Sequence, residues 1–156
     1  MKVVIVSGYF NPLHGGHLDM IEAARAMGDK LIVIVNNDKQ QLMKKGKIIL
    51  DEKNRLRLMR ALRDVNEVVL SIDDYETPDG ERPIIKTIEH IAKQHPEDKI
   101  IFANGGDRNT EKAIPEAAIC NQYGIEMVFG VGTEIRGHIK PESSSRINQE
   151  TGHEIV

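Results

Sequence analysis

Apolar residues occur along the chain in five short continuous runs, separated by longer segments in which polar and apolar residues are mixed. Continuous rather than alternating hydrophobicity is typical of strands that are covered on both faces, as in a parallel sheet between helices. The five runs comprise residues 3–6, 31–35, 67–72, 99–103 and 125–129. We therefore predict a five-stranded parallel sheet.

The segments between these runs have the periodicity of amphipathic helices. After the first run, apolar residues recur at positions 18, 21, 24 and 27, with charged residues between them. A helix capped by Asp51 is predicted after the second run, another starts near Pro83, and a third spans 115–123. Strands that alternate with helices in this way predict a doubly wound, Rossmann-like α/β fold, with residues 1–156 as a single domain.

The strand order also predicts where a ligand would bind. Sheets of this kind commonly have the order 3-2-1-4-5, numbered along the chain, and bind ligands past the carboxyl ends of the strands where the order reverses. The two loops that meet at this point are 8–17 and 104–108, which are rich in glycine and polar residues. Topology alone therefore predicts a site between these loops.

Composition narrows the class of protein. A chain of 156 residues that is 40% hydrophobic and 29% charged has the make-up of an ordinary folded protein. The net charge of −3 gives no electrostatic reason to expect a nucleic-acid polymer as partner. Cys120 is the single cysteine, which fits a reducing compartment and a buried, inert thiol. Without a membrane-length apolar run or a signal-peptide pattern, we expect a soluble cytoplasmic protein.

The most specific pattern is segment 7–18, Ser-Gly-Tyr-Phe-Asn-Pro-Leu-His-Gly-Gly-His-Leu, which joins the first strand to the first helix. A helix N-terminus offers backbone N–H groups and a partial positive charge, both suited to a phosphate. His14 and His17 share one face of the first turn, and Gly15 and Gly16 let an anion approach closely. Metal ligation and structural helix capping are the alternatives; without a third ligand a zinc site is poor, and we favour phosphate binding.

These residues resemble the His-x-Gly-His signature of the nucleotidyltransferase superfamily, including glycerol-3-phosphate cytidylyltransferase and the heptose-phosphate adenylyltransferases. The likeness extends over roughly residues 2–147. It implies that His14 and His17 are catalytic, as donors to the α-phosphate and to the departing pyrophosphate. It also implies a set of nucleotide-binding positions in the same segment, namely Gly8, Tyr9, Phe10, Asn11 and Gly16.

Lysines 44, 45 and 47 surround Gly46 in what we expect to be a loop after the second strand. A run of this kind is more often a solvated charged surface than a site. The pattern nevertheless resembles the lysine-bearing loop of the superfamily. That likeness points to Lys45 as a catalytic residue that stabilises phosphate charge and to Lys47 as a substrate-binding residue.

Arg55 lies on the stripe of its predicted helix that faces the sheet, four residues before Met59. Near the helix start, it should look into the crevice at the carboxyl edge of the strands. A buried ion pair, for example with Asp51, is the alternative; because the resembling families also place an arginine here, we favour a catalytic role. Asp38, at the end of the second strand, is expected either to touch the substrate or to organise the lysine loop.

Two later motifs also resemble the superfamily. A glycine-aspartate pair follows the fourth strand, and a serine run precedes a predicted terminal helix, where the superfamily holds the β- and γ-phosphates. The implied nucleotide-binding residues are Gly106, Asp107, Ser143, Ser144 and Ser145. Arg136 matches the arginine before the serine motif and is assigned to substrate binding.

The connection 73–82 is acidic and contains proline and glycine. Its plainest interpretation is a solvated loop, which we favour over an acidic metal site. We assign no metal-ligating residues anywhere in the chain.

The resemblance implies a nucleotidyltransferase, in which a phosphate monoester attacks the α-phosphorus of a nucleoside triphosphate and pyrophosphate leaves. We expect CTP as the nucleotide, an alcohol or sugar phosphate as the acceptor and Mg²⁺ as the cofactor. ATP acting on a sugar phosphate or mononucleotide is the alternative. A non-catalytic sensor of nucleoside triphosphates is a hypothesis from another class. Resemblance also suggests a homodimer.

Overall fold

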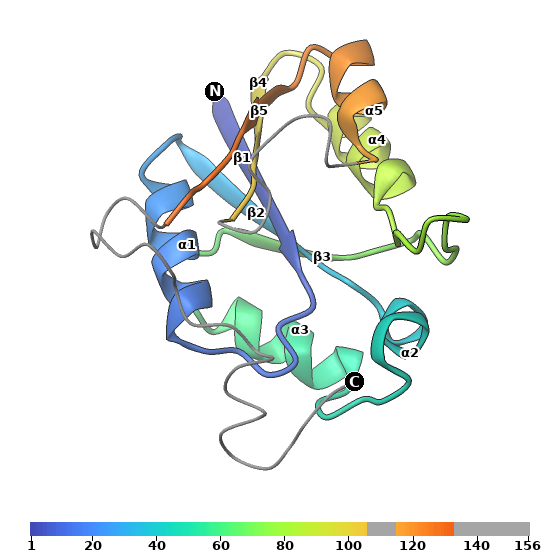
Figure 1. Cartoon of the computed structure of the whole chain (residues 1–156). Helices are drawn as coiled ribbons and strands as arrows, with labels where there is room; N and C mark the ends of the chain where they lie inside the picture. Colours follow the sequence, from blue (N-terminus) through green and yellow to red (C-terminus); the bar gives the residue numbers. More distant parts are fainter. Residues whose placement is uncertain (106–114, 133–156) are drawn as a thin grey trace.

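The computed structural model describes residues 1–105 and 115–132, which contain five strands and five helices (Figure 1). The strands are β1 (Lys2–Gly8), β2 (Lys30–Val35), β3 (Glu67–Leu70), β4 (Lys99–Ala103) and β5 (Glu126–Val128). The helices are α1 (Gly15–Arg25), α2 (Asp38–Lys45), α3 (Glu52–Arg60), α4 (Ile85–Gln94) and α5 (Ala117–Gln122). None of these helices is both long and apolar enough to cross a bilayer.

The strands form one parallel sheet in the order β3-β2-β1-β4-β5, which confirms the predicted topology. Gly8 at the end of β1 pairs with Val35 at the end of β2, and Val35 pairs with Leu70 at the end of β3. The carboxyl ends of these strands therefore meet at one edge of the sheet. The sequence predicts the ligand site at this edge, between the loops that follow β1 and β4.

Helices cover both faces of the sheet, as a doubly wound fold requires. One buried cluster joins the sheet to α4 and α5, and the other joins it to α1 and α3 (Figure 1). Successive residues of β1 alternate between the two clusters, so that Val3 and Ile5 face one and Val4 and Val6 face the other. This explains why the strands are continuously apolar. Cys120 is buried in the cluster with α4 and α5, as predicted.

The lysine-bearing segment after β2 is a helix, not the loop that the sequence analysis predicted. Asn37 caps α2, since its side chain accepts from the N–H of Gln40 while the side chain of Gln40 accepts from the N–H of Asn37. Gly46 ends the helix in a left-handed conformation with φ of 67°. Lys44 and Lys45 therefore lie in the last turn of α2, and Asp38 begins this helix rather than ending β2.

The prediction of a solvated loop for connection 73–82 is wrong for its two ends. Asp73 is fully buried and caps α4, because its carboxylate accepts from the N–H groups of Lys86 and Thr87 and from the Thr87 hydroxyl. At the other end, the side chain of Arg82 hydrogen-bonds to Tyr9. The acidic residues between them are mostly exposed, as expected.

Candidate active site

The chain turns sharply between β1 and α1, and Phe10 is folded back over the end of β1. Phe10 is buried and has φ of 53°, a left-handed conformation that residues with side chains rarely adopt. Its ring lies so close to Gly8 that an added Cβ there would stand 2.9 Å from Cζ of Phe10. The same ring meets His17 edge-on, with 4.9 Å between the ring centroids. Gly8 thus leaves room for the Phe10 ring, and that ring packs against His17.

Backbone hydrogen bonds fix the tautomers of His14 and His17 in the first turn of α1. Nδ1 of His14 accepts from the N–H of Gly16 at 3.1 Å, and Nδ1 of His17 accepts from the N–H of His14 at 3.2 Å. A ring nitrogen that accepts carries no proton, so each neutral imidazole holds its proton on Nε2. Metal ligation through Nε2 would require a protonated Nδ1 facing a backbone N–H. The pair is therefore arranged to donate hydrogen bonds.

The two imidazoles are stacked, with 3.8 Å between their centroids and 27° between their planes. Burial, and after it the electrostatic effects of His14 and Lys44, together lower the pKa of His17 from its ordinary value of 6.5 to about 3. His17 is accordingly neutral at physiological pH. It can donate a hydrogen bond to an anion there but cannot supply a proton as a general acid.

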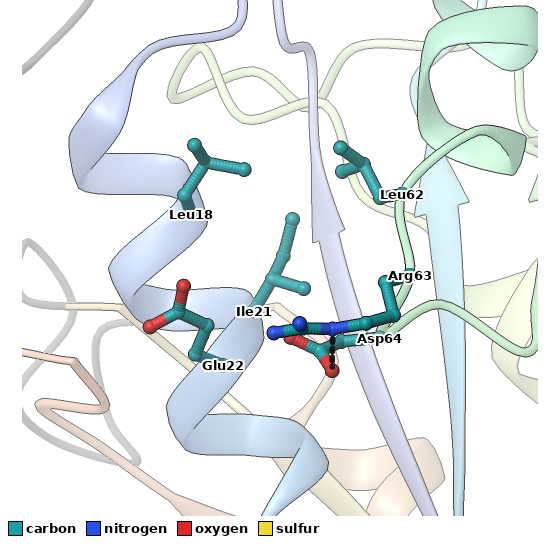
Figure 2. Close-up of a pocket in the computed structure, with 6 residues that line it drawn as sticks. All are labelled: Leu18, Ile21, Glu22, Leu62, Arg63 and Asp64. Carbon is teal, nitrogen blue, oxygen red and sulfur yellow. Dashed lines mark ion pairs between the residues drawn. The ribbon is translucent and has the colours of Figure 1, made fainter.

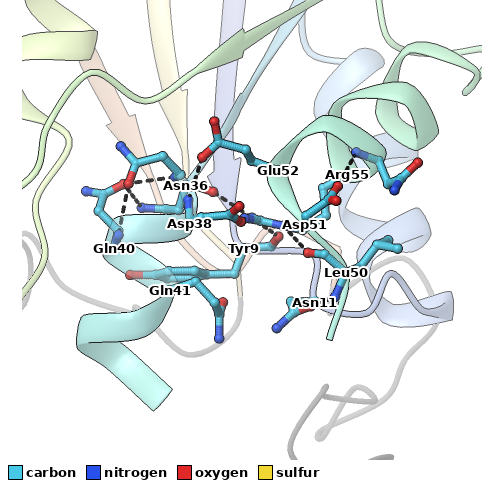
Figure 3. Close-up of polar contacts among 12 residues, drawn as sticks. Tyr9, Asn11, Asn36, Asp38, Gln40, Gln41, Leu50, Asp51, Glu52 and Arg55 are labelled. Atoms are coloured by element: carbon cyan, nitrogen blue, oxygen red, sulfur yellow. Dashed lines mark hydrogen bonds and ion pairs between the residues drawn. The ribbon is translucent and has the colours of Figure 1, made fainter. Parts of the chain in front are cut away.

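Arg55 is completely buried, and its guanidinium holds three segments of the carboxyl edge together (Figure 3). Nη1 donates to the carbonyl oxygens of Tyr9 at 2.9 Å and Asn36 at 2.5 Å, while Nε donates to that of Leu50 at 2.8 Å. Nη2 forms an ion pair with Oδ1 of Asp38 at 2.7 Å. The arginine therefore binds the loop after β1, the end of β2 and the segment before α3.

The partner of Arg55 is Asp38 and not Asp51, the partner that the sequence analysis considered. Asp51 instead caps α3, where its Oδ1 accepts from the N–H of Asn54 at 2.9 Å, as the sequence predicted. Asp38 is held from a second side by Glu52, whose Oε1 accepts from the N–H of Asp38 at 2.8 Å. The structure thus brings two predicted site residues, Arg55 and Asp38, into one network beneath the loop after β1.

Two buried side-chain amides tie the segment before α3 to the site. Oδ1 of Asn11 accepts from the N–H of Leu50 at 2.8 Å (Figure 3), and Nε2 of Gln41 donates to the carbonyl of Lys47 at 3.2 Å. Within the described residues, Nδ2 of Asn11 and Oε1 of Gln41 have no hydrogen-bond partner. Asn11, a predicted nucleotide-binding residue, therefore uses Oδ1 to bind the backbone and keeps Nδ2 as a donor without a partner among the described residues.

Tyr9 is contacted by two cationic side chains from different segments. The Nζ atom of Lys44 lies 4.2 Å from the centroid of the Tyr9 ring. Nε of Arg82 donates to the Tyr9 hydroxyl at 3.2 Å. The charge of Lys44 also lowers the pKa of His17, so the ammonium group lies within electrostatic range of that histidine.

The sequence analysis singled out neither Lys44 nor Arg82, the two cationic residues that contact Tyr9. The half-buried side chain of Lys45 makes no hydrogen bond or ion pair with the described residues, and Lys47 contributes only its backbone carbonyl. The one available signal for Arg82 is that it is the only basic residue in the acidic connection 73–82. Several predicted positions lie outside the described residues: Gly106, Asp107, Arg136, Ser143, Ser144 and Ser145.

A cavity of about 150 Å³ lies elsewhere, between α1 and the turn that joins α3 to β3 (Figure 2). Both histidines are absent from its lining, and its volume is below the roughly 300 Å³ of the smallest usual ligand pockets. The residues that line it are Leu18, Ile21, Glu22, Leu62, Arg63 and Asp64. A nucleotide does not fit this cavity, and the candidate site remains at the carboxyl edge.

The described residues do not offer a resident metal a set of protein ligands. In residues 1–105 and 115–132, His, Cys, Asp and Glu side chains nowhere gather in a group of three or more that could hold an ion. The carboxylate of Asp38 is committed to Arg55. Both histidines accept at Nδ1, which also disfavours their use as metal ligands.

The chain is similar to several known proteins. It is 32% identical over 141 residues to the bifunctional protein HldE of Koribacter versatilis, which covers 89% of this chain but only 24% of that protein. It is 37% identical over 91 residues to the FAD synthase of Ferroglobus placidus, covering 58% of this chain and 54% of the synthase. A lipopolysaccharide core biosynthesis protein from Thermoplasma volcanium shares the fold with a TM-score of 0.62 and 26% identity, covering 92% of this chain and 99% of that one.

The match to a family description is wider than the signature around the histidines. Residues 5–131 match the family described as cytidylyltransferase-like; this range includes most of β1, the other four strands and the whole candidate site within the described residues. The histidine pair at the N-terminus of α1 and the strand order are consistent with this match, and the chain belongs to the cytidylyltransferase-like family.

Proposed function

We propose that this protein transfers a nucleotidyl group from a nucleoside triphosphate to a small phosphate monoester and releases pyrophosphate. The observation that carries the proposal is the pair of Nε2–H donors that His14 and His17 present at the N-terminus of α1. Two fixed donors at a helix N-terminus suit an α-phosphate whose charge grows during the reaction.

The neutral state of His17 is consistent with this chemistry. An attacking phosphate monoester is already anionic, so the reaction needs little general base, and pyrophosphate leaves as a stable anion. What the reaction requires is orientation and neutralisation of charge. His17, with a pKa of about 3, would provide a hydrogen bond without exchanging its proton.

For the cationic contribution we propose Lys44 rather than Lys45. Lys44 lies over Tyr9 and close to His17, where its ammonium would offset phosphate charge. Arg55 is proposed as a positioning residue, since its guanidinium is buried and bound to backbone carbonyls and Asp38. Roles for Lys45, Lys47 and the residues outside the described part of the chain stay predictions.

ATP is the nucleotide that the comparisons favour, in place of the CTP expected from sequence. FAD contains an adenylyl group joined to a flavin phosphate, so a relative named FAD synthase makes a bond between AMP and a phosphate monoester. The Phe-Asn-Pro sequence at positions 10–12 resembles the nicotinate-mononucleotide adenylyltransferases, while the Gly-Asp pairs at 28–29 and 106–107 resemble the cytidylyl and heptose branch. We therefore propose ATP as donor and a sugar phosphate or related monoester as acceptor.

Mg²⁺ would enter this site with the nucleotide. Because the described residues offer no ligand set, we propose that the metal is carried by the triphosphate oxygens as part of the substrate, where it offsets phosphate charge. A single domain, a cytoplasmic location and a homodimer likewise stay predictions.

The test is pyrophosphate release from each of ATP, CTP, GTP and UTP with Mg²⁺ and a mixture of phosphate monoesters. The mixture contains sugar 1-phosphates, glycerol 3-phosphate, flavin mononucleotide and nicotinate mononucleotide, and mass spectrometry identifies the adduct. We expect pyrophosphate with ATP and much less with the other three. Faster release with CTP would restore the cytidylyl assignment. Nucleotide binding without pyrophosphate release from any mixture would contradict the enzyme and favour the sensor hypothesis.

A further inference from the structure

The connection 73–82 has a defined shape that delivers Arg82 to the candidate site. The N–H of Gly80 donates to the carbonyl of Thr77 at 3.0 Å, and the N–H of Thr77 donates to the carbonyl of Glu81 at 2.8 Å. This turn brings the chain back toward the sheet just before α4. There Arg82 reaches Tyr9, which precedes it by 73 residues.

Two of the three guanidinium nitrogens of Arg82 donate hydrogen bonds to described residues, and the third does not. Nε donates to the Tyr9 hydroxyl, while Nη1 donates to Oε2 of Glu76 at 3.1 Å and to the carbonyl of Gly80. Nη2 makes no hydrogen bond with any residue in 1–105 or 115–132, and 20% of the side chain is exposed. Nη2 therefore stays available to a ligand, and displacement of Glu76 from Nη1 would complete an edge of the planar fork that matches two phosphate oxygens.

Two positive charges gather around a single tyrosine ring at this place. Lys44 stands over the face of Tyr9 and Arg82 stands at its hydroxyl. An anion bound beside this ring would be attracted by both charges. Glu76 is the carboxylate that pairs with Arg82 in the protein as it stands, and its side chain is 39% exposed.

We propose that Arg82 and Lys44 form the binding site for the phosphate of the acceptor, and that this phosphate displaces Glu76 from Arg82. This inference rests on the proposed function, which places the α-phosphate of the nucleotide at His14 and His17. In-line attack requires the acceptor on the side of the α-phosphorus opposite the pyrophosphate. The charge of Lys44 acts on His17, and Lys44 also stands over the ring of Tyr9, whose hydroxyl accepts from Arg82, so Tyr9 links the proposed nucleotide site to the connection 73–82.

The bonds that change do not involve Arg82. An oxygen of the acceptor phosphate forms a bond to the α-phosphorus, and the bond from that phosphorus to the bridging oxygen of the β-phosphate breaks. The electron pair leaves with pyrophosphate. Arg82 would hold the two non-attacking oxygens of the acceptor phosphate and so orient the third oxygen for attack.

The experiment compares the binding of two probes by NMR titration. Mg²⁺ with α,β-methylene-ATP reports the nucleotide site, and α-D-glucose 1-phosphate at millimolar concentration reports the acceptor site, with D-glucose as the uncharged control. Arg82→Gln should weaken the binding of glucose 1-phosphate by about tenfold, the scale of a lost hydrogen bond to a charged group. It should change the dissociation constant of the nucleotide analogue by less than about twofold, and Arg82→Lys should recover part of the loss.

Two further variants, Glu76→Gln and Arg60→Gln, test the competing carboxylate and provide a control. Removing the competing carboxylate with Glu76→Gln should tighten the binding of glucose 1-phosphate by about threefold. Arg60 is an exposed arginine at the end of α3, and its replacement should change nothing. The proposal is overturned if Arg82→Gln leaves the affinity for glucose 1-phosphate unchanged, or weakens both probes equally.

Failure of the proposed function would look different. A wild-type protein that binds the nucleotide analogue but not glucose 1-phosphate would overturn the acceptor site and leave the nucleotide site in place. A protein that binds glucose 1-phosphate through Arg82 but not the analogue would support the anion site and contradict the nucleotidyl transfer.

Discussion

Nη2 of Arg55 lies 2.7 Å from Oδ1 of Asp38, and the side chain of Arg55 is completely buried while that of Asp38 is 28% exposed. A guanidinium in this position has lost its water and depends on its protein partners, which are one carboxylate and three backbone carbonyls. These partners belong to three segments that reach the same edge of the sheet. The pair thus couples the stability of the fold to the shape of the loop that carries Tyr9.

We expect Arg55→Met to lower the free energy of unfolding by about 3–5 kcal/mol, because it leaves a carboxylate and several carbonyls without their donor. Asp38→Asn should also destabilise the protein, since it removes the charge that opposes Arg55. Asp51→Asn should cost no more than about 0.5 kcal/mol, because asparagine caps a helix as well as aspartate does. Urea unfolding of the three variants measures this. Equal effects of Asp38→Asn and Asp51→Asn, or a stable but inactive Arg55→Met, would contradict a positioning role for Arg55.

Local patterns predicted the parts of this molecule that depend on neighbours in sequence. Continuous apolar runs gave the five strands, and Asp51 was recognised as a helix cap from its position before an amphipathic stretch. The helix α2 was missed although Asn37, Gln40 and Gly46 are suitable cap residues, because the lysines between them indicated a loop. Its apolar content is low, so the helical period carried little signal.

Contacts between distant segments could not be predicted from one sequence. Arg55 could be placed on the face toward the sheet, but its choice of Asp38 over Asp51 depends on where α2 starts. The bond between Arg82 and Tyr9 joins residues 73 positions apart through a loop with no periodicity. Such contacts are set by tertiary packing, which propensity and spacing do not contain.

His17 should stay neutral well below the ordinary titration range of histidine. Its pKa is about 3 in the folded protein and near 6.5 when unfolded, so the unfolded chain binds the extra proton between these values. Stability from this group is therefore full above pH 6.5 and is lost as the pH falls toward 3. We expect the Hε1 resonance of His17 to show no titration between pH 8 and pH 5.

The stability of His17→Asn supplies the matching control. Asparagine can still accept from the N–H of His14, but it does not titrate. Between pH 7 and pH 5, wild type should lose more free energy of unfolding than this variant. A resonance of His17 with a midpoint near 6.5 would contradict the buried, neutral histidine.

The proposed role of the histidines can be separated from their role in the helix cap. His14→Asn and His17→Asn each keep an oxygen close to the position of Nδ1, which accepts the backbone N–H, but remove the Nε2–H donor. We expect each variant to fold with nearly unchanged stability and to lower kcat by about 10²–10³, the scale of losing one donor to a developing charge. His90→Asn, at an exposed position on α4, is the control and should have wild-type kcat. If either active-site variant stays within threefold of wild type at saturating nucleotide, that histidine is not a donor in the reaction.

Lys44 and Lys45 are adjacent in α2 and offer the sharpest comparison, because a solvated charge run and a specific contact predict different outcomes. Lys44 lies over Tyr9 and its charge lowers the pKa of His17, whereas Lys45 has no such contact among the described residues. We expect Lys44→Gln to reduce kcat by about 10²-fold if its ammonium offsets charge in the transition state. The same change should raise the pKa of His17, since one of the charges that oppose its protonation is gone.

Lys45→Gln is the matched control; it should change kcat by no more than about threefold and leave the pKa of His17 unchanged. Steady-state kinetics and the Hε1 titration of His17 measure both effects in the same two variants. Small and equal effects on kcat would show that both lysines are part of a solvated charged surface. A larger effect of Lys45→Gln would support Lys45, the residue that the sequence favoured.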